Sequence, residues 1–179
     1  SDADAGSYKT VTVTGLVPTG DDAAKYTIAP YTTDAEIGKI ELTVSNITAN
    51  DREYDGTAVA TLGTAYSLDG IVEGETVTLD TSASTWVGSF ADASVGDNKP
   101  VTVTGLVPTG EHGGNYTVAS YATDADIGEK ELTVSNITAN DREYDATTEA
   151  TLGTVYSLAG KVPGDDVDLN DSSNWVGTF

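Results

Sequence analysis

The sequence predicts an all-β protein made of tandem, small β-sandwiches of the immunoglobulin kind, arranged like beads on a string. Two observations lead to this fold class: apolar and polar residues alternate along short segments, and the sequence repeats itself at an interval of 90 residues. A third observation is that no segment shows the spacing of apolar residues that is typical of an amphipathic helix. A β-grasp or another compact all-β fold is the alternative.

The repeat defines the expected organisation of the chain. VTVTGLVPTG occurs at 11–20 and again at 101–110, and ELTVSNITANDREYD occurs unchanged at 41–55 and 131–145. Self-similarity at a fixed period indicates a tandem array. We therefore expect 41–130 to be one complete repeat, 1–40 the C-terminal part of the repeat before it, and 131–179 the N-terminal part of the repeat after it.

The expected strands are short segments with a period of two residues that are rich in Val, Thr and Tyr. They are KTVTVTGL (9–16), KYTI (25–28), ELTV (41–44) and ETVTLD (75–80). Such alternation is typical of half-buried antiparallel strands. Turns are expected at PTGDD (18–22), SLDG (67–70), VEG (72–74) and SVGDNKP (94–100), and DDAAK (21–25) is at most one helical turn. Six or seven strands per repeat fit a small sandwich.

Composition excludes several classes of function. Eight Lys and Arg against 29 Asp and Glu give a net charge of −21, which disfavours nucleic acids and anionic membrane surfaces as partners. There is no Cys and a single histidine, so thiol chemistry and a His-based metal cluster are excluded. No apolar run is long enough to span a membrane and no signal peptide is recognisable, which suggests a mature or internal fragment.

The stretch NITANDREYDG (46–56) returns as NITANDREYDA (136–146) and holds both arginines of the chain. Its acidic residues resemble the start of an EF-hand loop, but the position of the obligatory bidentate Glu is Leu62, so that site is excluded. Calcium held in another way remains possible, although no cofactor is required. The candidate ligands are Asp34, Glu36, Asp51, Asp55, Asp124, Asp126, Asp141 and Asp145.

Catalysis is not expected. Paired carboxylates such as Asp51 and Asp55 would need a cleft and two different environments to act as acid and base, and a short repeat has little room for one. His112 aligns with Asp22 of the other copy, so it cannot anchor a triad shared by the repeats, and it is expected to be a solvated loop residue. We therefore expect no enzymatic activity.

The interpretation we favour for the repeated stretch is architectural. ELTVSNI continues into TANDREYDG without an intervening Gly or Pro, so the connection between successive repeats is expected to have little flexibility. In this hypothesis Arg52 clamps carboxylates across the junction, Tyr54 points into the core, and Asp55-Gly56 makes a turn. The junction residues are Asp51, Arg52, Glu53, Tyr54 and Asp55, with Asp141, Arg142, Glu143, Tyr144 and Asp145 in the second copy.

Aromatic residues give two further expectations. Trp86 and Trp175, one in each copy, are expected to anchor cores, with ligand stacking as the alternative. Exposed tyrosines would suit a carbohydrate-binding module that acts through avidity, although tyrosines also commonly fill strand faces. The candidates for that role are Tyr31, Tyr66, Tyr121 and Tyr156.

An ordered set of motifs carries a family resemblance. REYDG (52–56), IVEGETVTL (71–79), FADASVGDNKPVTVTGLVPTG (90–110) and GGNYTV (113–118) resemble the YDG repeat of large bacterial surface proteins, including filamentous-haemagglutinin-like adhesins. The chain departs from the pattern at Ala146, which replaces the naming Gly, and at Lys25-Tyr26, which replaces Asn-Tyr.

The resemblance implies a secreted stalk module at the cell surface, with no catalytic residues to carry over. The expected partners are neighbouring copies of the repeat, joined head to tail into a linear array or filament. A glycan or host-surface ligand would be bound elsewhere in the parent protein. The sequence thus favours a structural repeat of an extracellular adhesin, with ligand binding as the alternative.

Overall fold

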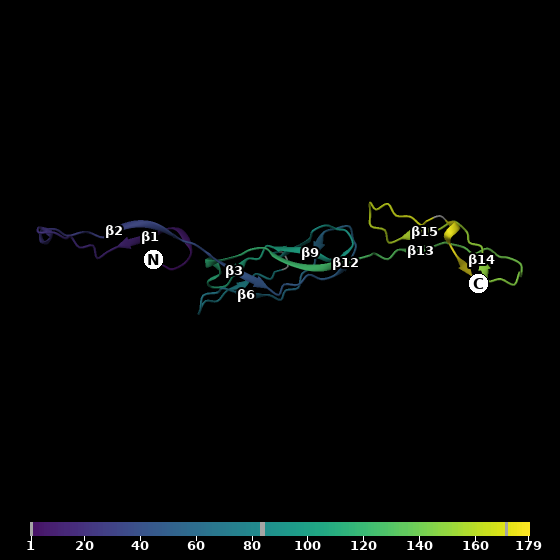
Figure 1. Cartoon of the computed structure of the whole chain (residues 1–179), viewed down its shortest axis with the longest axis horizontal. Helices are drawn as coiled ribbons and strands as arrows, with labels where there is room; N and C mark the ends of the chain where they lie inside the picture. The colour runs from purple at the N-terminus through teal and green to yellow at the C-terminus, as the bar shows by residue number, and fades with distance from the viewer. Residues whose placement is uncertain (1, 83–84, 171) are drawn as a thin grey trace. The chain divides into compact units, whose positions relative to one another are not determined.

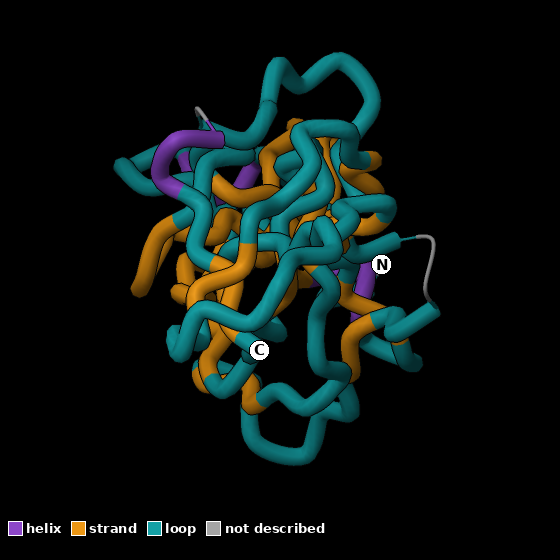
Figure 2. Tube along the Cα trace, turned by 90° about the vertical axis from the view of Figure 1, so that its right-hand side faces the viewer, coloured by secondary structure: helices purple, strands orange, loops and turns teal. Residues whose placement is uncertain are grey.

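The computed structural model describes residues 2–82, 85–170 and 172–179. Strands and loops make up nearly all of this part of the chain, as the orange and teal segments of Figure 2 show. The helical elements described are three single turns: η1 (Ala23–Lys25), η2 (Gly113–Asn115) and η3 (Ser172–Asn174). The predicted all-β class is confirmed, and DDAAK contributes one turn as expected.

The chain divides into two compact units, which do not coincide with the sequence repeats. Unit 1 contains Ser1–Asn50, Val59–Ala91 and Lys99–Ala125, and unit 2 contains Asp51–Ala58, Asp92–Asn98 and Asp126–Phe179. We use "unit" for these bodies and "repeat" for the 90-residue sequence period.

Unit 1 holds most of the strands, and Figure 1 labels β1, β2, β3 and β6 among them. β1 (Gly6–Val13) and β2 (Tyr31–Ile37) form an antiparallel pair, and β7 (Thr78–Leu79) and β10 (Pro108–Thr109) form another. β3 (Ile40–Ser45) lies between β6 (Ser67–Asp69), its antiparallel neighbour, and β11 (Tyr116–Val118), which runs parallel to it. A five-stranded sheet has the order β4-β12-β9-β8-β5, from β4 (Arg52–Glu53), β12 (Tyr121–Gly128), β9 (Gly96–Thr104), β8 (Val87–Phe90) and β5 (Val59–Ala60). Its β4, residues 96–98 of β9 and residues 126–128 of β12 are assigned to unit 2.

The core of unit 1 combines residues from both sides of position 90. One cluster contains the buried side chains of Ile47, Leu79, Val103 and Leu106, and a second contains Leu42, Val77 and Tyr116. Burial follows the predicted period of two: Val101 and Val103 of β9 are fully buried, whereas the threonines beside them are exposed. The halves 41–90 and 91–125 therefore bury each other's apolar faces.

Unit 2 has shorter strands. β4 (Arg52–Glu53) pairs in parallel with the end of β12, with Arg52 opposite Ile127 and Glu53 opposite Gly128. β13 (Thr133–Ser135) pairs with β15 (Ser157–Ala159), and β14 (Glu149–Ala150) pairs with β16 (Gly177–Thr178), both antiparallel.

Two expectations about strands need correction. KYTI (25–28) is not a strand: Lys25 ends η1, and residues 26–30 have no regular structure. Its counterpart in the other copy is the strand β11, which forms because it pairs with β3. The two parallel pairings, of β11 with β3 and of β12 with β4, also depart from the antiparallel arrangement that was expected. ELTV and ETVTLD do contain strands, β3 and β7.

Candidate functional site

The repeated REYDG stretch forms a tight turn in unit 2. The backbone amide of Tyr54 donates to the carbonyl of Gly128 at 2.9 Å, which fixes the start of the turn against the end of β12. One carboxylate oxygen of Asp55 accepts from both the amide and the hydroxyl of Thr57, each at 2.8 Å. Gly56 between them has φ +80°, a conformation that glycine adopts without cost.

Arg52 braces this turn from within. Its Nη1 lies 2.5 Å from Asp55 Oδ1, the same atom donates to the carbonyl of Glu53 at 3.1 Å, and Nη2 donates to the carbonyl of Thr57. The amide and hydroxyl of Thr57, and then Arg52, hold the pKa of Asp55 below its ordinary value. The hypothesis assigned Arg52 to carboxylates across a junction, whereas these contacts lie within residues 52–57.

The second copy builds the same turn without its glycine. Arg142 pairs with Asp145, and the Asp145 carboxylate accepts from the amide of Thr147 at 3.0 Å and from its hydroxyl at 2.8 Å. The pKa of Asp145 is lowered, first by Arg142 and then by Thr147. Ala146 adopts φ 62°, so the arginine, aspartate and threonine shape the turn even where an alanine must take a left-handed conformation.

Tyr54 reaches from the turn to the loop 160–167 of the following sequence repeat, and both belong to unit 2. Its hydroxyl donates to Asp165 Oδ1 at 3.2 Å, and that hydrogen bond to a carboxylate raises the pKa of Tyr54. Tyr54 and Val162 line the same pocket of about 460 Å³. A Cβ on Gly56 would lie 2.9 Å from Val162 Cγ1, so the loop approaches closely because residue 56 has no side chain.

This arrangement differs from the prediction for Tyr54, which placed the side chain in the core. Sequence reasoning also missed Val162 and Asp165 as members of the site. The sequence signal for this loop was weak. GKVPGD (160–165) aligns with GIVEGE (70–75), so a Gly-x-Val turn followed by an acidic residue recurs in both repeats. The sequence does not indicate which residues this loop contacts. In the second copy, the side chain of Tyr144 is 95% exposed.

A second link connects the start of the chain with the GGNY motif in unit 1. Asn115 Oδ1 accepts from the amide of Ala5 at 2.8 Å, and Asn115 Nδ2 donates to Asp4 Oδ1 at 3.1 Å. Next to it, the Tyr116 hydroxyl accepts from the amide of Val72 at 3.1 Å and donates to Glu75. Burial and the Glu75 carboxylate raise the pKa of Tyr116.

The carboxylates proposed as calcium ligands are dispersed. Asp51 accepts from the amide of Asp126 at 2.8 Å, and Asp126 accepts from the amide of Asn98 at 2.7 Å, so both serve backbone groups. Asp34 and Glu36 lie together on β2, where Asp34 accepts from Thr10 at 3.4 Å. Within residues 2–82, 85–170 and 172–179, no three side chains of His, Cys, Asp or Glu are placed to hold an ion. Calcium binding stays a prediction.

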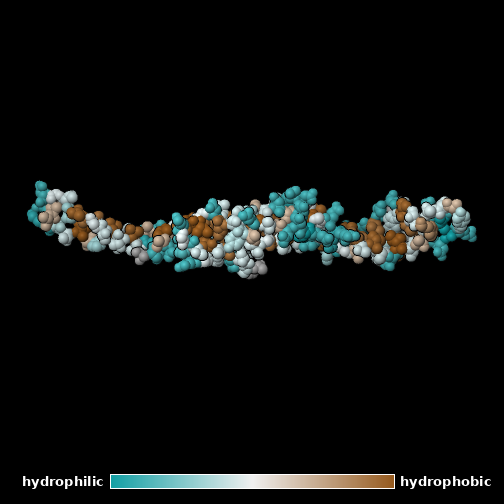
Figure 3. All heavy atoms as spheres, turned by 90° about the horizontal axis from the view of Figure 1, so that it is seen from below, coloured by the Kyte–Doolittle hydropathy of each residue, from teal (hydrophilic) through white to brown (hydrophobic). Residues whose placement is uncertain are grey.

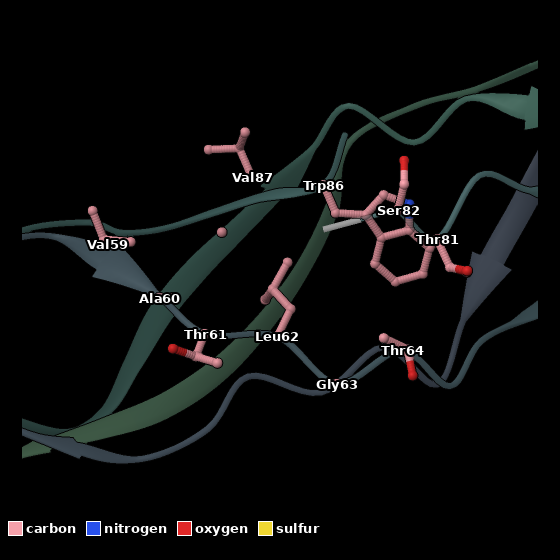
Figure 4. Close-up of a pocket in the computed structure, with 11 residues that line it drawn as sticks. Val59, Ala60, Thr61, Leu62, Gly63, Thr64, Thr81, Ser82, Trp86 and Val87 are labelled. Carbon is pink, nitrogen blue, oxygen red and sulfur yellow. The ribbon is translucent and has the colours of Figure 1, made fainter. Parts of the chain in front are cut away.

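The first tryptophan lies beside a cavity in unit 1. Trp86 packs edge-on against Tyr66, with ring centroids 5.8 Å apart, and contacts the cluster of Ile47 and Leu79. It also lines a cavity of about 390 Å³ (Figure 4), together with Leu62, Thr64, Thr81 and Ser82. Trp86 Nε1 is buried without a hydrogen-bond partner in the part of the chain that the structure describes.

The tyrosines proposed for carbohydrate binding have different environments. Tyr66 and Tyr121 are half-buried against the core, and the Tyr66 hydroxyl accepts from the amide of Leu79 at 2.9 Å. Tyr156 bonds Asp168 and packs edge-on against Trp175. Tyr31 is exposed. Tyr66, Tyr121 and Tyr156 are thus half-buried, as expected for tyrosines that fill strand faces, and Tyr31 alone of the four is exposed.

Comparison with known proteins agrees with the motifs. None of the helices described is long and apolar enough to cross a membrane. Searches among curated proteins and among solved structures found no match to this chain. A family model matches a stretch that includes the REYDG turn, Trp86 and the GGNY motif. Residues 38–124 match the family model described as the YDG domain.

Proposed function

We propose that this chain is a structural module that works in series, with each repeat completed by its neighbour. The observation that carries the proposal is that equivalent residues of the two copies are buried in the middle of the chain and exposed near its ends. Figure 3 shows apolar side chains, in brown, at the surface of the molecule. An exposed apolar surface of this kind indicates an interaction site.

Residues 1–40 show the contrast most clearly. Tyr26 is 67% exposed, whereas its equivalent Tyr116 is 2% exposed. The same holds for three further pairs, in which the first residue is exposed and the second buried: Val11 and Val101, Leu16 and Leu106, Ile37 and Ile127. The segment 91–130 is covered by 41–90, whereas no equivalent segment covers 1–40 in the part of the chain that the structure describes.

Residues 131–179 show the complementary contrast. Phe179 is 70% exposed and its equivalent Phe90 only 3%, and Ile137 is 36% exposed where Ile47 is 1%. Here the cover that is needed is a segment like 91–130. Residues 131–179 of one chain and residues 1–40 of the next chain therefore correspond to the two halves of a repeat, which residues 41–130 combine in one chain.

A head-to-tail contact between these halves does not close on itself, so it propagates as a linear array. The neighbour is either the adjoining stretch of one longer polypeptide or a separate copy of this chain. In both cases the repeat acts as an immunoglobulin-like sandwich module whose function is length: a non-enzymatic, extracellular stalk or filament of a bacterial surface protein. The net charge of −21 supports this role because it keeps neighbouring arrays apart.

Sedimentation velocity on the chain over a wide range of concentration tests the proposal. Tyr26→Asp places a charge where the assembled state buries an aromatic ring, so it should abolish association. Tyr8→Asp is the matched control, since Tyr8 is 86% exposed and its equivalent Asn98 is exposed too. Association that is equal in both variants, or absent from the parent chain at every concentration, would contradict assembly between separate copies.

A second candidate is carbohydrate binding, and the cavity beside Trp86 is the observation that favours it. Sugars pack on aromatic rings, and Thr64, Thr81 and Ser82 line the same cavity as the Trp86 ring. Saturable binding on a glycan array that is lost in Thr64→Ala and retained in Thr154→Ala, the equivalent position of the other copy, would support this alternative. Tyr66→Ala does not serve as a test because Tyr66 is part of the core.

A further inference from the structure

We infer that the YDG turn is a latch between successive repeats, in which the tyrosine of one repeat seats against the Gly-x-Val turn of the next. The closed latch is Tyr54 on the loop 160–167, and the open latch is Tyr144. The occupant that Tyr144 would take is the loop 70–75 of a second copy of this chain. This last step rests on the proposed end-to-end assembly, whereas the closed latch lies within a single chain.

The closed latch is built from three contacts in unit 2. The Tyr54 hydroxyl donates to Asp165, and the Tyr54 side chain lines one pocket with Val95, Leu132 and Val162. Gly56 lets Val162 come within 2.9 Å of the position that a Cβ would occupy. Each residue of the YDG motif therefore contributes to the latch, since Tyr54 reaches the loop, Asp55 shapes the turn, and Gly56 makes room for Val162.

The receiving loop has the same backbone in both copies. Residues 162–165 form a turn in which the amide of Asp165 donates to the carbonyl of Val162 at 3.1 Å, and residues 72–75 form the same turn with the equivalent bond at 3.0 Å. The two glycines of each loop have matching positive φ angles, 97° and 87° in 70–75 against 96° and 99° in 160–165. A loop that accepts one tyrosine can therefore accept the other.

The two side chains that would meet in the open latch are exposed. Val72, the equivalent of Val162, is 47% exposed, whereas Val162 beside Tyr54 is half-buried. Tyr144 is 95% exposed, whereas Tyr54 is half-buried. Glu75 is the equivalent of Asp165, and its carboxylate accepts from the Tyr116 hydroxyl of the same chain. The Tyr144 ring and the Val72 side chain are thus both accessible to a second copy of the chain.

Disulfide trapping tests both states, because the chain has no cysteine of its own. In the full chain, Gly56→Cys with Val162→Cys should oxidise within one molecule, since a Cβ on residue 56 would lie 2.9 Å from Val162 Cγ1, one of the positions that a sulfur on residue 162 can take. Ala146→Cys with Val72→Cys should instead give a ladder of covalent oligomers on a non-reducing gel. Ala146→Cys with Val176→Cys is the control, since Val176 is 84% exposed and outside the receiving loop.

The outcomes separate this inference from the proposed function. If the Gly56 and Val162 pair oxidises no faster than the control pair, the latch is overturned. If that pair closes and the Ala146 and Val72 pair forms no ladder, the latch within the chain stands, and its extension to a second copy fails together with assembly between separate chains. A ladder above the control supports both.

Hydrogen exchange gives a second test that does not depend on cysteine at a left-handed position. Tyr54→Ala should make the amides of 160–167 exchange about tenfold faster, because packing and a hydrogen bond are lost there. Tyr144→Ala is the matched control and should leave the same amides unchanged. Equal protection of 160–167 in the two variants would overturn the latch.

Discussion

Tyr26 and Tyr116 occupy the same position in successive repeats, yet only Tyr116 is buried, with its hydroxyl bonded to Val72 and Glu75. The two residues therefore show the same side chain with and without its partner segment. Their contrast is the basis of the first prediction.

Truncation of Tyr116 should destabilise the chain strongly, and truncation of Tyr26 should not. Tyr116→Ala removes a fully buried aromatic ring and should cost about 3 to 5 kcal/mol of the free energy of unfolding. Tyr26→Ala should change it by about 0.5 kcal/mol at most. Urea denaturation at a concentration where the chain is monomeric measures both. Similar losses in the two variants would show that 1–40 is already covered.

Arg52 should stabilise its own turn through several hydrogen bonds and not through charge alone. Arg52→Ala should cost about 1 to 2 kcal/mol, because the side chain is only 16% exposed and bonds Asp55 and two carbonyls. Arg52→Lys keeps the charge but lacks the planar fork, so it should recover little of the loss. Full recovery by lysine in thermal melts would mean that only the charge matters.

Acid should weaken the two turns through their aspartates. Hydrogen bonds from Thr57, and then Arg52, lower the folded-state pKa of Asp55. Arg142, and then Thr147, lower the folded-state pKa of Asp145. A lowered pKa gives stability that is complete above the unfolded value of about 3.9 and is lost as the pH falls through the folded value.

Asp55→Asn keeps the acceptor for Thr57 and removes the charge, so stability should fall less steeply with acid below about pH 4. The control is Asp166→Asn, which changes the net charge equally outside the turn. Tryptophan fluorescence follows unfolding as the pH is lowered. If the free energy of unfolding falls equally steeply in the parent chain and in Asp55→Asn, this turn contributes nothing to the pH dependence.

Calcium gives a direct test of the dispersed carboxylates. An ion that binds the folded chain raises the melting temperature relative to chelator, by linkage. We expect such a rise in millimolar calcium if sites form, with magnesium at the same ionic strength as the control. Melting curves that coincide in calcium, magnesium and chelator would remove calcium from consideration.

Small-angle scattering tests the role in length. A compact globule of 179 residues has a radius of gyration of about 16 Å by the usual size scaling, whereas modules in series should exceed about 20 Å. The stalk proposal expects the larger value for this chain in dilute solution. A value near that of the globule would leave the proposal without a physical basis.

The sequence determined the strand character and the repeat. Alternation in KTVTVTGL and ELTVSNI predicted strands that the structure contains, because a side-chain period of two depends only on local backbone geometry. The exact recurrence of ELTVSNITANDREYD singled out the turn, and its Asp55, Gly56 and Thr57 fold it locally. The motifs also pointed to the YDG family, which matches residues 38–124.

The tertiary structure decided which copies of these patterns are buried and what the turn touches. KYTI (25–28) and NYTV (115–118) share the central Tyr-Thr and end in a β-branched residue, but only Tyr116–Val118 forms a strand, because β3 lies beside it. Likewise Tyr54 and Tyr144 sit in identical heptapeptides, and only Tyr54 meets a loop that follows it by more than 100 residues. A strand needs a neighbouring strand for its hydrogen bonds, and an apolar face needs another segment to bury it. The sequence of a segment does not specify which other segment supplies either contact.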